Sequence, residues 1–483
     1  MPEAFRNYVG GDWVESETGE TFEVLNPADT SEVAAEYQES NRADAKAAVE
    51  AANAAEDEWA DTPAPQRGAI LNEAAKILDD RKDELTEMLS HEEGKTLAEA
   101  GGEVQRAIDI FYYYAQKALD FGGTVKAASG PDTNLKTRKE PLGTVGLITP
   151  WNYPIAIPAW KLAPALATGN TVVLKPATAA PGVSRALFEA LDDAGLPDGV
   201  ANWVSGPGSK VGDVFITHDD IDGVSFTGSS EVGHMVYEDA TDGMKRVQCE
   251  MGGKNPTIVS DTADVEEAAE IVANGAFGVT GQACTACSRA IVYEDVYDEF
   301  VEALVDEAAA IDIGPGLEDP GMGPHVTESE LEGTLDYIEV GENEGATLAF
   351  GGEELTDGEY ADGYYVEPTV FTDVERDMRI AQEEIFGPVV GVISVSGFEE
   401  AMDVANDVNY GLSSSIVTQD VTEANTFVDD IEAGVAKVND KTTGLELHVP
   451  FGGYKDSSTN TYREQGDEGM EFFTSTKTVY ENY

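Results

Sequence analysis

The stretch that decides the fold class runs from residue 144 to residue 176, TVGLITPWNYPIAIPAWKLAPALATGNTVVLKP. Its two short apolar runs, at 144–148 and 171–175, are typical of buried strands. Between them lie a turn bounded by prolines and a helical pattern near residues 157–167. A strand, a helix and a second strand in this order predict a parallel pair within a doubly wound sheet.

The same alternation extends along the chain in both directions. Downstream we expect a helix at 182–194, strands at 201–205 and 223–226, and a helix from about 229. Beyond residue 259 the alternation restarts, with a helix at 264–277, a strand at 289–294 and a helix at 295–311. Upstream, helical spacing predicts helices at 43–60, 66–90 and 102–119. The pattern therefore predicts an α/β protein with two such domains.

Two segments depart from this pattern. Residues 122–143 are polar and strand-like, and they interrupt the first α/β unit. Residues 472–483, FFTSTKTVYENY, alternate between apolar and polar side chains as a strand does. Neither segment has a core of its own, so our hypothesis is that they form an oligomerisation arm.

The charge of the chain is extreme. The 483 residues include 29 Lys and Arg against 93 Asp and Glu, a formal net charge of −64. Self-repulsion of this size weakens a compact state unless salt screens it, and the acids are spread along the whole chain. We therefore predict that the protein comes from an organism with a saline cytoplasm. We expect it to bind neither nucleic acid nor anionic membranes. No signal peptide and no apolar stretch of membrane-spanning length is found.

The stretch GQACTACSR, residues 281–289, holds Cys284 and Cys287 in a C-x-x-C spacing. A structural zinc site needs about four ligands, but only Cys249 and five scattered histidines remain, so we expect no metal. A thioredoxin-like pair would lie early in a small domain. Two buried apolar cysteines are the ordinary alternative, and a single nucleophile is the other.

Seven stretches, taken in order, resemble the aldehyde dehydrogenase superfamily from about residue 5 to the C-terminus. They are TPWNYPI (149–155), GNTVVLKPAT (169–178), FTGSSEVG (226–233), EMGGKNP (250–256), GQACTACSR (281–289), EEIFGPV (383–389) and PFGGYKDS (450–457). The resemblance implies a Rossmann-like dinucleotide-binding domain, an α/β catalytic domain and a small β oligomerisation arm. The implied boundaries are 1–121 with 144–251, then 252–452, with 122–143 and 453–483 as arm and C-terminal tail.

The resemblance assigns three catalytic roles. Cys284 aligns with the family nucleophile, whose thiolate adds to the aldehyde carbon and later leaves from a thioester. Asn152 aligns with the side-chain donor to the oxyanion, although an asparagine before Tyr-Pro is also an ordinary turn residue. Glu250 aligns with the general base, although a lone glutamate is usually solvated. Gly252 and Gly253 favour close backbone approach there instead.

The resemblance also implies a nicotinamide dinucleotide, NADP or NAD. The positions carried over are Trp151, Lys175, Thr178, Gly208, Gly212, Gly228, Ser229, Gly233, Glu384 and Phe386. The FTGSSEVG turn would offer free N–H groups at a helix start to the pyrophosphate. Many NAD-specific relatives carry Glu at the position of Thr178, and a neutral residue there predicts that NADP is accepted.

The substrate is implied in less detail. Tyr153, Trp160 and Phe451 align with an aromatic tunnel, although aromatic residues at such spacing are often plain core. Arg106 would point down this tunnel and pair with a substrate carboxylate, or it would pair with Glu103 or Asp109 on the surface. KLAPALATGN (161–170) and YREQGDEGMEFFTSTKTVY (462–480) resemble the α-ketoglutarate semialdehyde dehydrogenases, and this resemblance implies oxidation of 2,5-dioxopentanoate to 2-oxoglutarate.

Rival interpretations remain at this point. Succinate semialdehyde and betaine aldehyde are alternative substrates, and a positively charged aldehyde would fit Arg106 poorly. A catalytically silent structural member would be expected to lose Cys284, Glu250 or Asn152, and all three are present. A homodimer or homotetramer is expected from the arm. A further hypothesis is a protective disulfide between Cys284 and Cys287.

Overall fold

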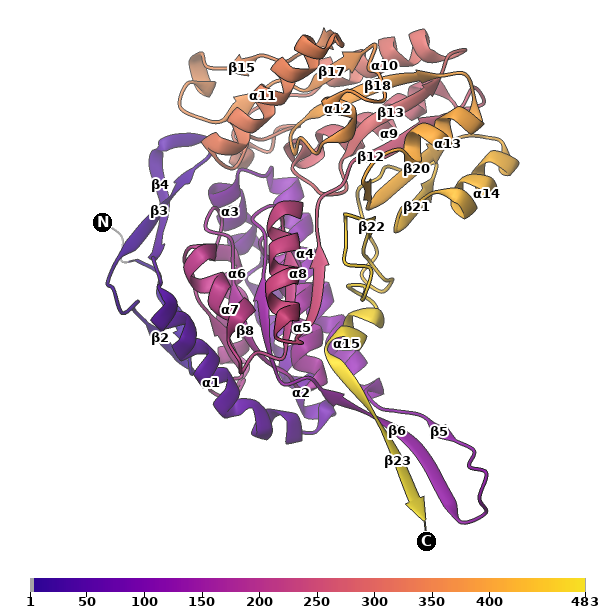
Figure 1. The fold of residues 1–483 in the computed structure, drawn as a ribbon. Helices are drawn as coiled ribbons and strands as arrows, with labels where there is room; N and C mark the ends of the chain where they lie inside the picture. The colour runs from indigo at the N-terminus through magenta and orange to yellow at the C-terminus, as the bar shows by residue number, and fades with distance from the viewer. Residues whose placement is uncertain (1–3, 483) are drawn as a thin grey trace.

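Two seven-stranded sheets, each covered by helices, lie one above the other, and a narrow arm projects from the lower half (Figure 1). This computed structural model describes residues 4–482. Residues 1–3 and Tyr483, the last residue of the predicted C-terminal strand, lie outside the described residues. The α/β class predicted from the alternation of strands and helices is confirmed.

The first sheet has the strand order β11-β10-β7-β8-β9-β1-β2. Five of its strands are parallel: β7 (Thr144–Ile148), β8 (Thr171–Lys175), β9 (Ala201–Trp203), β10 (Gly223–Thr227) and β11 (Arg246–Glu250). The antiparallel strands β1 (Asn7–Val9) and β2 (Asp12–Val14) complete one edge. The parallel strands are almost wholly buried, as expected for a sheet with helices on both faces.

Helices of this half agree closely with the predicted ranges 43–60, 157–167 and 182–194, whereas the helix predicted at 102–119 begins at Leu97. They are α1 (Arg42–Asp61), α2 (Ala64–Asp80), α3 (Lys82–Glu93), α4 (Leu97–Lys117), η1 (Ala118–Asp120), α5 (Ala156–Thr168), α6 (Gly182–Asp193), η2 (Gly208–Gly212), α7 (Asp213–Thr217) and α8 (Ser230–Asp242). Every residue of α5 is buried, because this helix packs between the sheet and helices α2 and α4.

The second sheet has the order β14-β17-β18-β13-β12-β20-β21, and only β14 is antiparallel to its neighbour. The strands are β12 (Asn255–Val259), β13 (Cys287–Tyr293), β14 (Thr347–Phe350), β17 (Thr369–Thr372), β18 (Val389–Val395), β20 (Ser413–Val417) and β21 (Val435–Val438). Its helices are α9 (Val265–Phe277), η3 (Gly278–Gly281), α10 (Tyr297–Ala309), η4 (Gly316–Glu318), α11 (Glu328–Glu344), η5 (Gly358–Tyr360), α12 (Arg379–Gln382), α13 (Phe398–Asn406) and α14 (Val421–Asp430). Two small pairs accompany it, β15 (Glu354–Leu355) with β16 (Tyr365–Val366) and β19 (Tyr410–Gly411) with β22 (Tyr454–Lys455).

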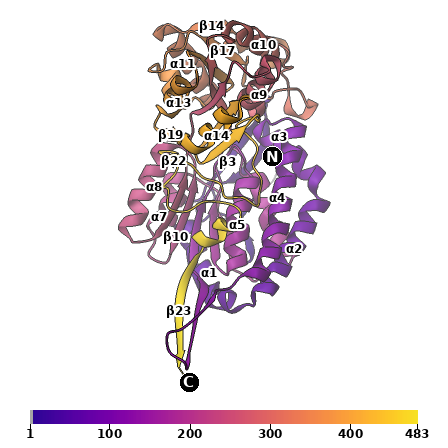
Figure 2. The ribbon, with the colours of Figure 1, turned by 90° about the vertical axis from the view of Figure 1, so that its right-hand side faces the viewer.

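The arm joins two segments that are far apart in the sequence. Strand β23 (Thr474–Asn482) pairs antiparallel with β6 (Thr133–Pro141) along its whole length, and the short β5 (Val125–Lys126) lies on the other side of β6. The short helix α15 (Glu468–Phe472) leads into β23. The arm extends away from the body in both views (Figures 1 and 2). Its assignment to oligomerisation, like the exact domain boundaries, stays a prediction.

One predicted helix is wrong. Residues 66–90 do not form a single helix, because the chain breaks at Arg81, where α2 ends and α3 begins. Asp79 and Asp80 place negative charge at the unfavourable C-terminal end of α2, and the acids of the next turn favour a new N-terminus. Arg81 forms an ion pair with Glu189 of α6, and this contact fixes the junction between α2 and α3 to α6.

A two-stranded hairpin has no counterpart in our sequence predictions. Strands β3 (Thr21–Asn26) and β4 (Asp29–Gln38) pair with two irregularities in register. The turn of the hairpin reaches the upper half, where Pro27 O accepts from Tyr364 N at 3.0 Å and Thr30 N donates to Asp362 O at 2.6 Å. The hairpin therefore ties the two halves together.

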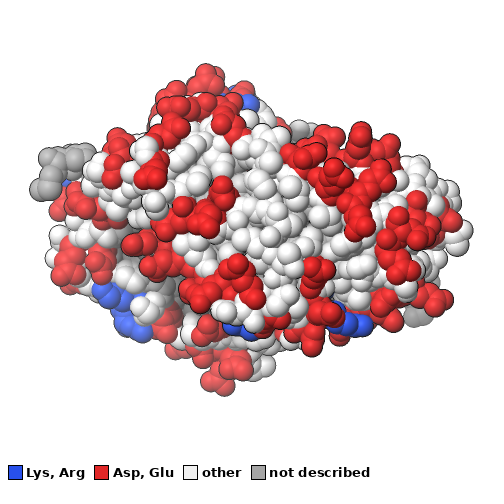
Figure 3. All heavy atoms as spheres, turned by 90° about the horizontal axis from the view of Figure 1, so that it is seen from above, with Lys and Arg blue, Asp and Glu red and all other residues white. Residues whose placement is uncertain are grey.

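Acidic side chains are spread over the surface. Figure 3 shows them across the face seen from above, with few basic groups between them. No helix within residues 4–482 is long and apolar enough to cross a membrane.

Candidate active site

Cys284 lies in the loop between η3 and β13. In η3, Val279 and Thr280 adopt positive φ angles of 55° and 54°, which are unfavourable for β-branched residues. Contacts from outside hold this turn: Val279 N donates to Glu99 Oε1 at 2.6 Å, and Thr280 Oγ1 donates to Gly323 O at 3.0 Å. The loop that carries Cys284 is therefore fixed from its N-terminal side.

Two cavities meet at Cys284. One, of about 290 Å³, is lined mainly by α4, α5 and the 444–451 segment, and the other, of about 190 Å³, is lined by the turns after β7, β10 and β11. Cys284 is in the wall of both. Its sulfur can therefore meet one reactant from each cavity, which a buried structural cysteine could not do.

The thiol of Cys284 lies in an unfavourable place for a negative charge. Burial raises the pKa of Cys284 far above its ordinary value, and the carboxylates of Glu384 and Glu250 raise it further. In this state the group is a thiol at neutral pH. Ionisation therefore needs a proton acceptor or a nearby positive charge.

Asn152 is buried in the turn before α5. Its side-chain Nδ2 donates to the carbonyl of Gln282 at 2.9 Å, two residues before Cys284, and Asn152 lines the smaller cavity together with Cys284. The structure therefore brings the predicted donor to the loop of the predicted nucleophile.

Glu250, at the end of β11, is only 1% exposed, which rules out a solvated surface glutamate. Its Oε1 accepts from Ser458 Oγ at 2.9 Å and its Oε2 accepts from Gly453 N at 3.0 Å. Burial raises the pKa of Glu250 well above its usual range, and Glu464 raises it further. Glu250 lines neither cavity, so the carboxylate is turned toward the C-terminal segment and away from Cys284.

The two glycines after Glu250 are closely approached, as their residue type predicts. A Cβ on Gly252 would overlap the carboxylate of Glu384, and one on Gly253 would lie 2.6 Å from the carbonyl of Cys284. Gly253 N donates to Glu384 Oε1 at 3.0 Å. Burial raises the pKa of Glu384 to about 7.

The smaller cavity collects many of the residues predicted to bind a dinucleotide. Trp151 and Phe386 meet edge to face with ring centroids 5.4 Å apart, and Phe386 adopts a positive φ of 64°. The full lining is Pro150, Trp151, Asn152, Ile157, Thr227, Gly228, Ser229, Met251, Gly252, Cys284, Glu330, Glu384 and Phe386. Ser229 stands at the N-terminus of α8, where free N–H groups favour an anion. Sequence reasoning missed Glu330.

Five predicted cofactor residues lie outside that lining. Lys175 is buried at the end of β8, which lowers its pKa to about 8, and a Cβ on Gly212 would lie 3.9 Å from its side chain. Thr178 and Gly208 are exposed. Gly233 packs against Met251, which itself lines the cavity. Lys175 and Gly212 are therefore neighbours.

The larger cavity contains all four predicted substrate residues: Arg106, Tyr153, Trp160 and Phe451. The rings of Trp160 and Phe451 are 6.1 Å apart. The cavity also contains Glu103, predicted only as a surface partner of Arg106, and two charged residues that sequence reasoning missed, Lys95 and Glu99. Lys95 and Glu99 lie before the helix predicted at 102–119, so no predicted element pointed to them.

A buried ion pair lies next to Glu250 and was not predicted. Lys161 of α5 pairs with Glu464, and its ammonium also donates to Ser225 Oγ at 2.7 Å. Both charged side chains are almost fully buried. Because Glu464 is the charged neighbour that raises the pKa of Glu250, this pair adjusts the electrostatics of the predicted base.

Cys287 points elsewhere. It begins β13, packs in the core beneath α9, and its Sγ donates to Thr257 Oγ1 at 3.2 Å. Its partner in the proposed disulfide, Cys284, faces the two cavities. A disulfide would require Cys287 to leave this core position, so the disulfide hypothesis has no support from the geometry.

One cysteine therefore lies in the wall of two cavities, one lined by the residues predicted to contact a substrate and the other by many of those predicted to bind a dinucleotide. The profile of the aldehyde dehydrogenase family matches residues 13–479. The chain belongs to this family and is an oxidoreductase that acts on aldehydes.

The chain is similar over its whole length to individual members of the family. The chain is 67% identical to the α-ketoglutarate semialdehyde dehydrogenase of Haloferax volcanii, over the full length of both. It is 46% identical to the α-ketoglutaric semialdehyde dehydrogenase of Bacillus subtilis, covering 99% of this chain and 98% of that one. The crystal structure of betaine aldehyde dehydrogenase from Staphylococcus aureus with NAD+ superimposes with a TM-score of 0.96 at 36% identity, covering 99% of this chain and 95% of that one.

Proposed function

We propose that this chain oxidises 2,5-dioxopentanoate to 2-oxoglutarate with NAD(P)+, through a thioester on Cys284. The observation that carries the proposal is the meeting of two cavities at one cysteine, with a guanidinium, Arg106, in the wall of the larger. The relatives from Haloferax volcanii and Bacillus subtilis, named for the same semialdehyde, support the choice of substrate.

The residues of the smaller cavity fit a nicotinamide dinucleotide. Glu384 would accept from a ribose hydroxyl, Trp151 and Phe386 would flank the nucleotide, and the start of α8 would face its phosphates. The glycine at 252 leaves no side chain between the backbone and Glu384. When bound, the cofactor supplies the acceptor for the hydride. Thr178 carries no negative charge against a 2′-phosphate, so NADP is proposed beside NAD.

The chain's own residues perform the remaining chemistry. The thiol of Cys284 gives its proton to water, its thiolate adds to the aldehyde carbon, and the amide of Asn152 donates to the oxyanion that forms. Loss of the hydride leaves a thioester on Cys284. Glu250 then removes a proton from water, whose oxygen attacks the thioester and releases the thiolate and the carboxylic acid. For this step the Glu250 side chain turns from Ser458 toward Cys284.

Arg106 gives the proposal its substrate specificity. A carboxylate four carbons from the aldehyde carbon would lie along the cavity from Cys284, and Arg106 is a cation within the same walls. Charge-assisted bonds to a guanidinium are directional and strong. On a chain of net charge −64, a local cation is needed to admit an anionic substrate.

Initial rates at molar KCl test this function. The substrates are 2,5-dioxopentanoate, succinate semialdehyde, betaine aldehyde and propanal, each with NAD and with NADP. A clear preference in kcat/KM for 2,5-dioxopentanoate is expected. Comparable rates on all four substrates, or a preference for propanal, would be consistent with the chemistry of the family but would contradict the proposed substrate. Succinate semialdehyde is the second candidate, because its carboxylate would also meet Arg106.

We also propose that the arm joins copies of this chain into a homodimer or homotetramer, in a saline cytoplasm. Residues 122–143 and 474–483 carry five basic and three acidic residues, so the arm is positive on an otherwise strongly acidic protein. Its Val125 and Tyr480 are 86% and 68% exposed. A second copy offers the acidic surface that such an arm would meet.

Sedimentation velocity of the full chain tests the assembly. The wild type is expected to sediment as a dimer or tetramer, and a Val125→Asp/Tyr480→Asp variant as a smaller species. Val421→Asp, at an exposed valine of α14 outside the arm, is the matched control. A monomeric wild type, or an unchanged arm variant, would contradict the proposal.

A further inference from the structure

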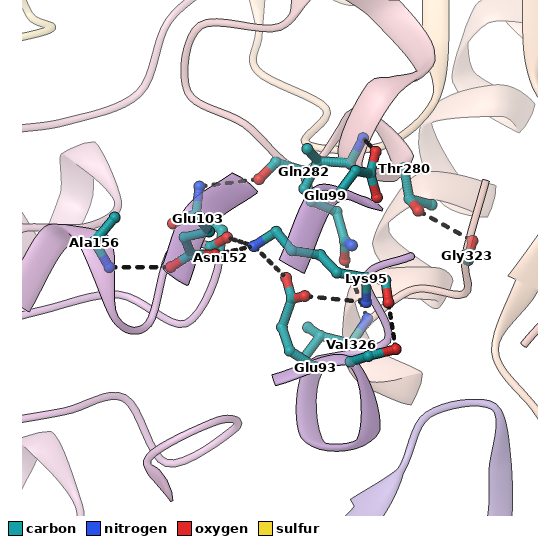
Figure 4. A network of polar contacts seen from close by, with 12 residues as sticks. Glu93, Lys95, Glu99, Glu103, Asn152, Ala156, Thr280, Gln282, Gly323 and Val326 are labelled. Atoms are coloured by element: carbon teal, nitrogen blue, oxygen red, sulfur yellow. Dashed lines mark hydrogen bonds and ion pairs between the residues drawn. The ribbon is translucent and has the colours of Figure 1, made fainter. Parts of the chain in front are cut away.

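A buried lysine lies beneath the turn that carries Asn152. Lys95 follows α3, and its side chain is 2% exposed. Its ammonium lies 2.8 Å from Glu103 Oε2 and 3.3 Å from Glu93 Oε1, and it donates to the main-chain carbonyl of Asn152 (Figure 4). It also lies 4.4 Å from the ring centre of Tyr153.

The partner of this lysine holds the other end of the same turn. Glu103 Oε1 accepts from Ile155 N at 3.0 Å. It also accepts from Ala156 N at 3.1 Å, where α5 begins (Figure 4). Its Oε2 is the atom that pairs with Lys95. One ion pair therefore holds residue 152 through its carbonyl and residues 155 and 156 through their N–H groups.

The charges of the cluster are arranged so that the lysine stays protonated. Burial lowers the pKa of Lys95, but Glu103 and Glu93 more than compensate and the net shift is upward. A positive ammonium facing a main-chain carbonyl makes a stronger bond than a neutral donor would.

We propose that Lys95 is a positioning residue for the oxyanion donor: together with Glu103 it fixes the turn 152–156 so that the Asn152 amide lies beside Cys284. The inference rests on the role of Asn152 in the proposed function. Lys95 holds the main-chain carbonyl of Asn152, and Gln282 O accepts from the side-chain amide of Asn152. The two contacts together fix where Nδ2 lies. Misplacement of such a donor by about 1 Å costs about 10²-fold in rate.

A cycle of variants tests this relationship. The single-turnover rate of NAD(P)H formation is measured for wild type, Asn152→Ala, Lys95→Met and the double variant. Asn152→Ala is expected to lower the rate about 10²-fold or more. Lys95→Met is expected to lower it about 10²-fold in the wild type, but less than about twofold when Asn152 is already alanine. The KM for NAD(P)+ is expected to stay unchanged, and Lys95→Arg is expected to restore part of the rate.

Two further variants separate positioning from loss of fold. Lys95→Met leaves the buried Glu103 without its partner, which is destabilising. Lys95→Met/Glu103→Gln removes both charges and keeps an acceptor for Ile155 N and Ala156 N, so it is expected to fold and still to be slow. Arg67→Met is the matched control, because Arg67 is a buried cation that bonds Ala167 O at 3.1 Å, near the far end of α5. It is expected to lower Tm and leave the rate unchanged.

The possible results are distinct. If Asn152→Ala has the wild-type rate, Asn152 is not the oxyanion donor, and the positioning role of Lys95 is then wrong as well. If Asn152→Ala is slow but Lys95→Met lowers the rate equally in both backgrounds, only the positioning role is wrong. If the Lys95→Met/Glu103→Gln variant folds and has the wild-type rate, the proposal is also overturned. Loss of the Lys95 effect in the Asn152→Ala background supports it.

Discussion

The guanidinium of Arg106 donates from Nη2 to Oε1 of Gln465 across 2.9 Å, at the wall of the cavity that contains Cys284. Within residues 4–482 Arg106 forms no salt bridge: Glu103 pairs with Lys95, and Asp109 accepts from Gln105. Neither predicted partner therefore forms a salt bridge with Arg106, although Glu446 and Asp109 lie close enough to act on its charge, and Arg106 is a half-buried cation in the cavity wall.

Replacing Arg106 by alanine is expected to raise the KM for 2,5-dioxopentanoate by about 10- to 100-fold. A charge-assisted hydrogen bond contributes about 1.5–3 kcal/mol, and each 1.4 kcal/mol corresponds to about tenfold. The kcat/KM for propanal, which has no carboxylate, is expected to stay unchanged. Arg376→Ala, which removes an exposed arginine paired with Asp407, is the control. An unchanged KM in Arg106→Ala would dispose of the carboxylate anchor.

The reactivity of Cys284 is expected to rise with pH well beyond neutrality. Its pKa is raised by burial and by Glu384 and Glu250, so in the absence of ligands the thiolate fraction grows only in alkaline solution. Iodoacetamide alkylation followed by mass spectrometry measures this rate. Glu250→Gln removes one of the groups that raise this pKa and is expected to speed alkylation in alkaline solution, where Glu250 of the wild type is ionised. A maximal rate already reached at pH 7 would contradict the expected direction.

The same experiment decides the fate of the second cysteine. Cys287 is buried in the core, and its thiol donates a hydrogen bond to Thr257. We therefore expect that Cys287 is not alkylated in the folded chain. Cys287→Ser is expected to keep the wild-type response to peroxide. Recovery by thiol reductants in the wild type and not in Cys287→Ser would revive the disulfide.

Cofactor binding is expected to weaken as the pH falls through about 7. Glu384 has a pKa raised to about 7, so it is a carboxylate above that pH and a neutral acid below it. The carboxylate is the stronger acceptor for a ribose hydroxyl. Titrating NAD(P)H fluorescence between pH 6 and 8 measures the effect. Glu384→Gln is expected to bind less tightly above pH 7 and to lose the pH dependence, and a wild-type pH profile in that variant would refute the assignment.

Much of this fold could be predicted because the parallel strands are short, apolar and separated by helical patterns. The strand at 171–175 and the helix at 264–277 agree with β8 and α9 to within a residue. The break at Arg81 could not be predicted, because the helical spacing continues across it and the ion pair with Glu189 is distant in the sequence. The β3–β4 hairpin was missed for a similar reason, since its turn is held by residues 362 and 364.

The site divides in the same way. Cys284, Asn152 and the aromatic residues of the larger cavity lie in stretches that resemble the family, and the structure gathers them. The pair Lys161 and Glu464 is separated by 303 residues, and no local pattern connects them. The orientation of Glu250 toward Ser458 likewise depends on a contact across 208 residues. Residue type indicates the chemistry, whereas burial and long-range contacts decide where each group points.

The C-terminal segment has a consequence for how the enzyme would behave in solution. Residues 453 and 458 bond Glu250, Glu464 pairs with Lys161, and the same segment ends in β23 of the arm. The residues that bond Glu250 therefore belong to the same continuous C-terminal segment as β23, the strand of the arm proposed to join subunits. Dilution that separates the subunits would loosen the groups that donate to Glu250. Specific activity would therefore decrease when the enzyme is diluted and recover when it is concentrated again.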